Sequence, residues 1–240
     1  MTTKRICLWS SPRNISTALM YSFAQRSDTE VIDEPLYAHY LKATGVDHPG
    51  KEEILQAQEQ DGEKVVKEVI LGEHHKPVVF FKQMTHHLVA LNEEFLDHVS
   101  NVLFIRDPKQ IISSYAQVRP NVTMLDIGIE KQWQLFQQLH EKGLEPVLVD
   151  SNEILKNPDS LLRKLCAILN IPFYEEMLHW PAGPKEQDGV WAKYWYDNVH
   201  QSTGFAKQET SDRKLPDYLK PLYNESKKYY DKLYIHSLKA

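Results

Sequence analysis

The chain is poor in cysteine and has no long apolar run. Among its 240 residues, only Cys7 and Cys166 carry thiols, and both lie in apolar segments, so we expect buried free thiols rather than a disulfide. No stretch approaches the roughly 20 apolar residues that a membrane helix needs. The first apolar run is also too short for a signal peptide. These absences favour a cytoplasmic protein with no membrane span.

The charge and the spacing of the histidines exclude two further classes of function. The net charge of −5 and the pI near 6.1 argue against a surface that binds nucleic acid polymers. The histidines show neither HExxH spacing nor a partnering cysteine pair, so no metal site is predicted. There is no internal repeat or low-complexity linker, and the hydrophobic content of 42% is ample for a buried core. We therefore expect one domain over residues 1–240.

Short apolar segments alternate with helical patterns along the chain. The predicted strands cover residues 5–9, 30–32, 78–82, 101–105 and 146–149. The predicted helices cover residues 16–26, 52–72, 87–96, 108–118, 130–143 and 158–169. Such alternation predicts a three-layer α/β sandwich, with a central, mainly parallel sheet flanked by helices. An aromatic loop at 183–205 and a C-terminal helix at 215–238 are expected to pack on this core.

Residues 5–25, RICLWSSPRNISTALMYSFAQ, combine a strand, a polar loop and a helix start. The loop presents backbone N–H groups and a helix N-terminus to an anion, and Arg13 adds a planar fork of donors. The loop is not a Walker A motif, because residues 5–25 contain no glycine. An ordinary βα turn, with Asn14 or Ser16 as a helix cap, is the alternative.

A second polar loop follows the predicted strand 101–105. Arg106 stands at the end of this strand, Pro108 suits the first turn of a helix, and Ser114 lies two turns further along. Ligands of parallel α/β sheets bind beyond the carboxyl ends of the strands. We therefore expect both polar loops at the same edge of the sheet.

Together the two loops resemble those of the sulfotransferase family, which uses 3′-phosphoadenosine 5′-phosphosulfate (PAPS) and has a P-loop-NTPase-like fold. The resemblance spans roughly residues 5–173. It implies that the 5′-phosphosulfate is bound by Ser11, Pro12, Arg13, Asn14, Ile15, Ser16 and Thr17. By the same resemblance Arg106 and Ser114 bind the 3′-phosphate, and a later loop with Trp191 and Lys193 closes on it.

The resemblance implies transfer of a sulfuryl group to a hydroxyl or amine of a small acceptor, without a metal. Arg13 and Lys82 would neutralise charge, and either Glu34 or His86 would take the acceptor's proton. Loops 37–51 and 119–128 would select the acceptor. Two alternatives stay open: a P-loop kinase of a small molecule, and a non-catalytic nucleotide-binding relative, since Ile15 replaces the glycine of the family's loop.

Overall fold

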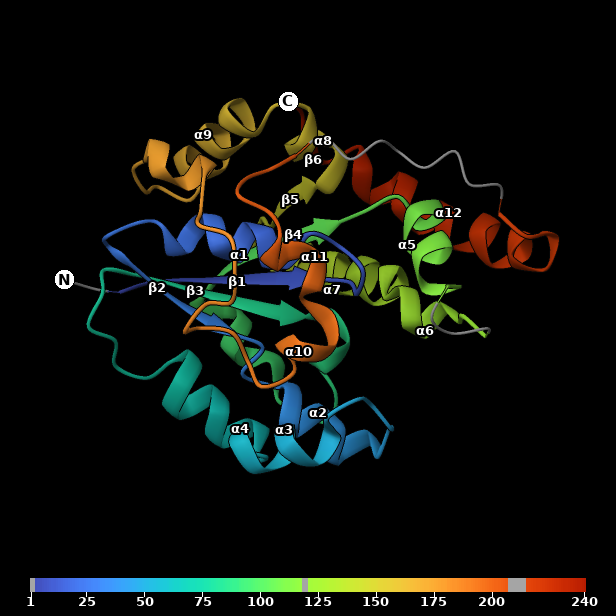
Figure 1. Ribbon diagram of the computed structural model, residues 1–240, viewed down its shortest axis with the longest axis horizontal. Helices are drawn as coiled ribbons and strands as arrows, with labels where there is room; N and C mark the ends of the chain where they lie inside the picture. Colours follow the sequence, from blue (N-terminus) through green and yellow to red (C-terminus); the bar gives the residue numbers. More distant parts are fainter. Residues whose placement is uncertain (1–2, 118–120, 207–214) are drawn as a thin grey trace. The chain divides into compact units, whose positions relative to one another are not determined.

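A computed structural model of the chain describes residues 3–117, 121–206 and 215–240 (Figure 1). Within them one six-stranded sheet has the order β2-β3-β1-β4-β5-β6. The pairs β2–β3, β4–β5 and β5–β6 all run parallel. Helices flank the sheet, which confirms the predicted α/β class. The strands are β1 (Lys4–Ser10), β2 (Thr29–Asp33), β3 (Val78–Met84), β4 (Ser100–Ile105), β5 (Val147–Asp150) and β6 (Ser237–Leu238).

Tertiary contacts divide the chain into two compact units. The first unit comprises Met1–Leu8, Ser16–Asn101 and Tyr174–Gly204. The second comprises Trp9–Ile15, Val102–Phe173 and Phe205–Ala240. The expected single domain over the whole chain stays a prediction. No helix in the described part of the chain is both long and apolar enough to cross a membrane.

Helix α1 covers β2 and β3 in the first unit. Phe23 of α1 stacks on Phe80 of β3, with the ring centroids 4.2 Å apart. Both rings are buried, so this contact is part of the apolar core that fixes the helix on the sheet. The helical elements of the unit are α1 (Ser16–Ala24), α2 (Tyr37–Thr44), α3 (Lys51–Ala57), α4 (Gly62–Val65), η1 (Val66–Ile70, a π-helical turn), the 3₁₀ turns η2 (Thr85–His87), η3 (Glu93–His98) and η4 (Glu175–Leu178), α10 (Ala192–Trp195) and α11 (Asp197–His200).

Two predicted helices of this unit are wrong. The helix expected over 52–72 is interrupted at Gln58, which has an extended backbone and whose side chain bonds the carbonyl of Glu34 and the N–H of Ala38. A new helix then starts at Asp61, whose carboxylate caps α4. The helix expected over 87–96 is two separate 3₁₀ turns. The predicted acceptor loop 37–51 contains α2, which the apolar pattern did not reveal.

Helix starts in the second unit follow their local signals. The side chain of Asp107 caps α5, with Pro108 in the first turn, and Asn157 and Pro158 begin α9 in the same way. The helical elements are α5 (Pro108–Tyr115), α6 (Met124–Ile127), α7 (Ile129–Glu141), α8 (Ser151–Lys156), α9 (Pro158–Ile168), η5 (Asp217–Leu219) and α12 (Lys220–Tyr234).

The C-terminal part of the second unit differs from the predicted secondary structure. The C-terminal helix expected over 215–238 stops at Tyr234, and Ser237–Leu238 forms β6 beside β5 instead. Ser237 and Leu238 pair with Leu148 and Val149 of β5. Residue 118 of the predicted helix 108–118, and residues 119–120 of the predicted loop 119–128, lie outside the described residues.

Tyrosine hydroxyls attach α12 to its neighbours. Tyr230 donates to Asp150 Oδ2 at 3.0 Å, and Tyr229 donates to Glu130 Oε1 at 2.9 Å. The acceptors of the two bonds differ in burial: Asp150 is fully buried, whereas Glu130 is only half-buried. Burial raises the pKa of Asp150, and the bond from Tyr230 acts against that rise.

We expect Tyr230→Phe to lower the free energy of unfolding by about 1.5–3 kcal/mol, because a buried carboxylate loses a hydrogen bond. Tyr229→Phe is the matched control and should have a smaller effect, since solvent can replace its bond. Chemical denaturation of both variants measures the difference. Equal losses would show that burial of the acceptor does not determine the strength of these bonds.

Candidate functional site

Arg13 and Arg106 are joined in the second unit. Nη1 of Arg106 donates to the backbone carbonyl of Arg13 at 2.7 Å, although 93 residues separate them. Nε of Arg13 donates to the hydroxyl of Ser114 on α5 at 3.0 Å. The structure therefore brings together three residues that the sequence assigned to two different loops.

The loop backbone is held by side-chain amides. Nδ2 of Asn14 donates to the carbonyl of Phe104 at the end of β4 at 2.9 Å, and Oδ1 of Asn14 accepts from the N–H of Ile15 at 2.9 Å. Gln132 of α7 donates to the same Phe104 carbonyl and to that of Trp9, at 2.9 and 3.1 Å. Both strand ends are therefore fixed by long-range contacts.

Arg13 is the loop residue with an unusual backbone conformation. Its φ of 57° lies in the left-handed region, which is uncommon for a residue with a side chain. Ile15 is not among the described residues with positive φ. Ile15 can therefore replace the glycine of the family's loop without the strain that a positive φ would bring.

The electrostatics of this cluster suit an anion. Burial lowers the pKa of Arg106 and the nearby charge of Arg13 lowers it further, while the charges of Asp150 and Asp107 act against this fall. No carboxylate forms an ion pair with Arg13 in the described chain. The hydroxyl of Ser11 is buried and has no hydrogen-bond partner among the described residues. Two like charges and an unused donor are conditions that a bound anion would relieve. Of the other predicted loop residues, Pro12 precedes Arg13, and Ser16 and Thr17 open α1.

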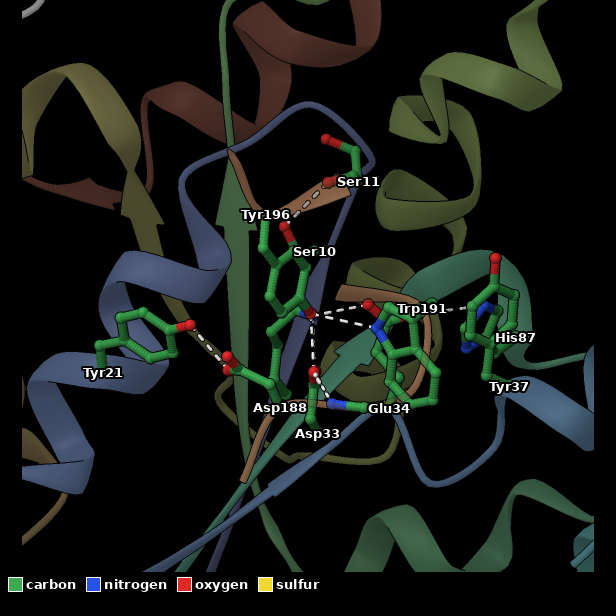
Figure 2. A network of polar contacts seen from close by, with 12 residues as sticks. Ser10, Ser11, Tyr21, Asp33, Glu34, Tyr37, His87, Asp188, Trp191 and Tyr196 are labelled. Atoms are coloured by element: carbon green, nitrogen blue, oxygen red, sulfur yellow. Dashed lines mark hydrogen bonds and ion pairs between the residues drawn. The ribbon is translucent and has the colours of Figure 1, made fainter. Parts of the chain in front are cut away.

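A buried lysine, Lys82, is bonded to three side chains of the first unit, Asp33, Glu34 and Tyr196, which Figure 2 shows close together. Nζ of Lys82, at the end of β3, donates to Asp33 Oδ1, Glu34 Oε1 and the hydroxyl of Tyr196, each at 2.6 Å. We call these four residues the Lys82 cluster; all four are buried. An ammonium has three N–H donors, so Lys82 uses all of them within the cluster.

The Lys82 cluster contains one ammonium group and two carboxyl groups. Burial opposes the charged form of Lys82, but the charges of Asp33 and Glu34 together hold its pKa well above the usual range. Burial raises the pKa of Glu34 to about 7; Lys82 opposes this rise and Asp33 adds to it. With Asp33 and Glu34 both ionised, the cluster carries one excess negative charge. A proton taken up by Glu34 would make it neutral.

The position of Glu34 is defined by its backbone. Its φ is 41°, its N–H donates to the carbonyl of Lys82 at 2.7 Å, and its carbonyl accepts from Gln58 at 3.1 Å. Residues held in a sparsely populated conformation occur preferentially at functional sites. Glu34 is thus a buried carboxylate with a fixed orientation and a pKa near neutrality.

The two histidines after β3 make different contacts. Nε2 of His87 lies 3.8 Å from Glu34 Oε2, and burial holds the pKa of His87 well below its usual value. The predicted base His86 instead contacts the rings of Tyr40 and His87, at centroid distances of 4.8 and 4.7 Å. Figure 2 shows the His87 ring beside Tyr37, on which it stacks at 4.9 Å.

The predicted nucleotide residues Trp191 and Lys193 make contacts within the first unit. Nε1 of Trp191 donates to the Tyr196 hydroxyl at 3.2 Å, and its ring is buried against α2 and α3. A side chain at Gly189 would meet this ring at 2.2 Å, so glycine is required there. Lys193 is exposed and pairs with Glu53 of α3 at 2.6 Å. Binding of a nucleotide by these two residues stays a prediction.

The sequence analysis did not predict the contact between Asp33 and Tyr196. In the structure the Tyr196 hydroxyl donates to Asp33 Oδ2 at 2.7 Å, and the N–H of Gly189 reaches the same oxygen at 3.3 Å. The acidic pair at the end of β2 was a visible signal for Asp33. No local sequence pattern indicates a role for Tyr196, because its partners Lys82 and Asp33 are more than 100 residues away in the chain. No group of three metal-binding side chains occurs within the described ranges.

Lys82→Met should lower the free energy of unfolding by about 3–5 kcal/mol, because it leaves two buried carboxylates without their cation. Lys193→Met is the control: it breaks a Lys–Glu pair of the same 2.6 Å length, but an exposed one, and should cause no measurable loss. Denaturant unfolding of both variants tests this. A stable Lys82→Met protein would mean that the cluster does not contribute to the fold.

Known proteins resemble the chain in both sequence and fold. It is 44% identical over 224 residues to Branched-chain-amino-acid aminotransferase-like protein 1 of Arabidopsis thaliana, and 42% identical to protein 2 of the same name. These matches cover 90% of this chain but 40% of each relative, so the chain spans about two fifths of their length. The solved Sulfotransferase Domain from the Curacin Biosynthetic Pathway has the same fold, with a TM-score of 0.63, 16% identity and coverage of 97% of this chain and 98% of that one.

The family itself is shown by a match over most of the sequence. Residues 4–229 match the sequence profile of the family described as Sulfotransferase domain. This range includes the Arg13–Arg106–Ser114 contacts and the Lys82 cluster. The chain therefore belongs to the sulfotransferase domain family.

Proposed function

We propose that this domain is a cytoplasmic enzyme that transfers a sulfuryl group from PAPS to a hydroxyl or amine of a small acceptor. Membership of the sulfotransferase family supports the reaction type. The observation that carries the choice of donor is the contact of Arg106 and Ser114 with Arg13 in the second unit. A nucleotide with two anionic ends needs cations and N–H donors of this kind.

Each anionic end of the donor has its own binding groups in this proposal. Residues 11–17 bind the 5′-phosphosulfate through backbone N–H groups, the N-terminus of α1 and the hydroxyls of Ser11, Ser16 and Thr17. Arg106 and Ser114 bind the 3′-phosphate. Trp191 and Lys193 are further proposed nucleotide contacts.

Glu34 is the proposed base. The acceptor atom forms a bond to sulfur while the bond from sulfur to the bridging phosphate oxygen breaks, and 3′,5′-adenosine bisphosphate leaves. The acceptor's proton passes to Glu34, whose raised pKa makes it able to accept a proton near neutral pH. Lys82 is a positioning residue here, because its three donors already hold Asp33, Glu34 and Tyr196.

The donor can be tested by binding alone. 3′,5′-Adenosine bisphosphate should bind about ten- to a hundredfold more tightly than AMP, since a charge-assisted phosphate contact contributes about 1.5–3 kcal/mol. Isothermal titration calorimetry with these two nucleotides, and with ATP plus magnesium, measures this preference. Equal affinity for both adenosine phosphates, or a preference for ATP with magnesium, would favour a small-molecule kinase instead.

The base can be tested by pH–rate profiles once an acceptor is in hand. Glu34→Gln should reduce kcat by roughly 10²–10⁴-fold with nearly unchanged nucleotide affinity. In the unaltered enzyme the rate should be low where Glu34 is protonated and rise to a plateau above a midpoint near 7, and this rise should vanish in Glu34→Gln.

His86→Ala provides the comparison, and we expect it to slow turnover by less than about tenfold. A large loss in His86→Ala with little change in Glu34→Gln would move the role of base to the histidine. If nucleotide binds but no acceptor turns over in any variant, the domain is a binding module without catalysis.

A further inference from the structure

Helix α7 begins beside the loop that follows β1. Gly128 ends α6 and directly precedes Ile129, the first residue of α7, with a φ of 72°. A Cβ at position 128 would lie 3.6 Å from the Cβ of Ser11 and 4.0 Å from the ring of Pro12. Within the second unit, the N-terminus of this 13-residue helix is therefore in contact with the first residues of the proposed donor loop.

A side-chain amide holds α7 in this place. The backbone N–H of Gln132 donates to the carbonyl of Gly128 at 3.1 Å, which closes the first turn of the helix. The side-chain Nε2 of Gln132 donates to the carbonyls of Trp9 and Phe104, at 3.1 and 2.9 Å. These carbonyls belong to the carboxyl-terminal parts of β1 and β4. The first turn of α7 is thus attached to the strand end from which the donor loop starts.

Hydrogen-bond donors are in excess where α7 and the loop meet. The first N–H groups of a helix have no partner inside the helix, and no described side chain caps this end of α7. Glu130, the acidic residue of the first turn, is bonded to Tyr229 of α12. The hydroxyl of Ser11 is buried and has no hydrogen-bond partner among the described residues. A helix N-terminus carries about half an elementary positive charge, so these two kinds of donor together suit an anion.

The order of the loop residues indicates which anionic group is bound. A 5′-phosphosulfate has a phosphate next to the nucleoside and a sulfate at its free end. The helix that directly follows such a loop is the usual phosphate site, and here Ser16 and Thr17 open α1. Ser11 stands at the opposite end of the loop sequence, next to α7. The sulfate, with three oxygens that accept hydrogen bonds, is the group left for Ser11 and α7.

We propose that the hydroxyl of Ser11 and the N-terminus of α7 together bind the sulfate oxygens of PAPS. This proposal rests on the proposed function, because it assigns groups within the donor site of that reaction. The loop 119–128, expected to select the acceptor, then ends at Gly128 in a contact with the donor. The site distinguishes PAPS from its product 3′,5′-adenosine bisphosphate, which lacks the sulfate.

PAPS and 3′,5′-adenosine bisphosphate test the proposal directly, in the absence of an acceptor. Ser11→Ala should weaken PAPS about tenfold or more, because a hydrogen bond to a charged group is lost, and weaken the bisphosphate by less than about threefold. Calorimetry on the full chain measures both affinities. Ser226→Ala is the control: it removes a buried hydroxyl of the same unit that is bonded to the carbonyl of Tyr223, and both affinities should stay unchanged.

Two glycines at the ends of α7 provide a second matched pair. Gly128 and Gly143 have φ values of 72° and 73°, so alanine brings similar strain at both positions. A Cβ at Gly143 would meet no described atom within 4 Å, whereas one at Gly128 would stand beside Ser11. Gly128→Ala should weaken PAPS about three- to tenfold and leave the bisphosphate nearly unchanged, while Gly143→Ala should change neither affinity. Denaturant unfolding should show similar losses of stability in the two variants.

Two results would overturn the proposal. Equal losses for PAPS and the bisphosphate in Ser11→Ala and Gly128→Ala would mean that these groups serve the 5′-phosphate or only the shape of the loop. An unchanged PAPS affinity in both variants would mean that the start of α7 does not bind the sulfate.

The proposed function is judged separately, on the unaltered protein, by its preference for the bisphosphate over AMP. If this preference is present and the effects on PAPS are absent, only the assignment of α7 and Ser11 fails. If the preference itself is absent, the proposed donor is wrong and the assignment fails with it.

Discussion

A fully buried ammonium must find an acceptor for each of its three N–H groups, and Lys82 meets this constraint with three side chains. Asp33 and Glu34 come from the end of β2, and Tyr196 comes from a segment more than 100 residues further along the chain. Removing any acceptor would leave a buried donor unsatisfied. The path of the chain after β2 and the fold of the loop around Tyr196 therefore depend on this one cation.

The same constraint explains how Glu34 can be both buried and reactive. The charge of Lys82 stabilises an ionised carboxylate in the protein interior, but here one ammonium faces two carboxylates, Asp33 and Glu34. Burial then raises the pKa of Glu34 to about 7, a value suited to a proton acceptor. A second lysine at this site would lower the pKa of Glu34. Without Lys82, the pKa of Glu34 would rise further and the carboxyl group would stay protonated at neutral pH.

In the second unit two positively charged side chains, Arg13 and Arg106, lie close together. Arg106 is joined to Arg13 through the backbone carbonyl of Arg13, and the Arg13 side chain is joined to α5 through the hydroxyl of Ser114. Neither bond neutralises a guanidinium, although the charges of Asp150 and Asp107 partly offset the effect of Arg13 on the pKa of Arg106. The left-handed backbone of Arg13 shows that the loop accepts local strain to keep the arrangement.

Several features of the chain could be predicted from the sequence. The alternation of apolar strands and helical patterns gave the α/β class, and the starts of α5 and α9 followed from Asp107–Pro108 and Asn157–Pro158, because caps act within one helical turn. The residue types for anion binding were also visible in both loops. Only the tertiary structure decided the break at Gln58, the strand β6, the three partners of Lys82 and the direction of Arg13. Each of these depends on hydrogen-bond partners that are distant in sequence, and a buried polar group selects such partners by what the fold places within its reach.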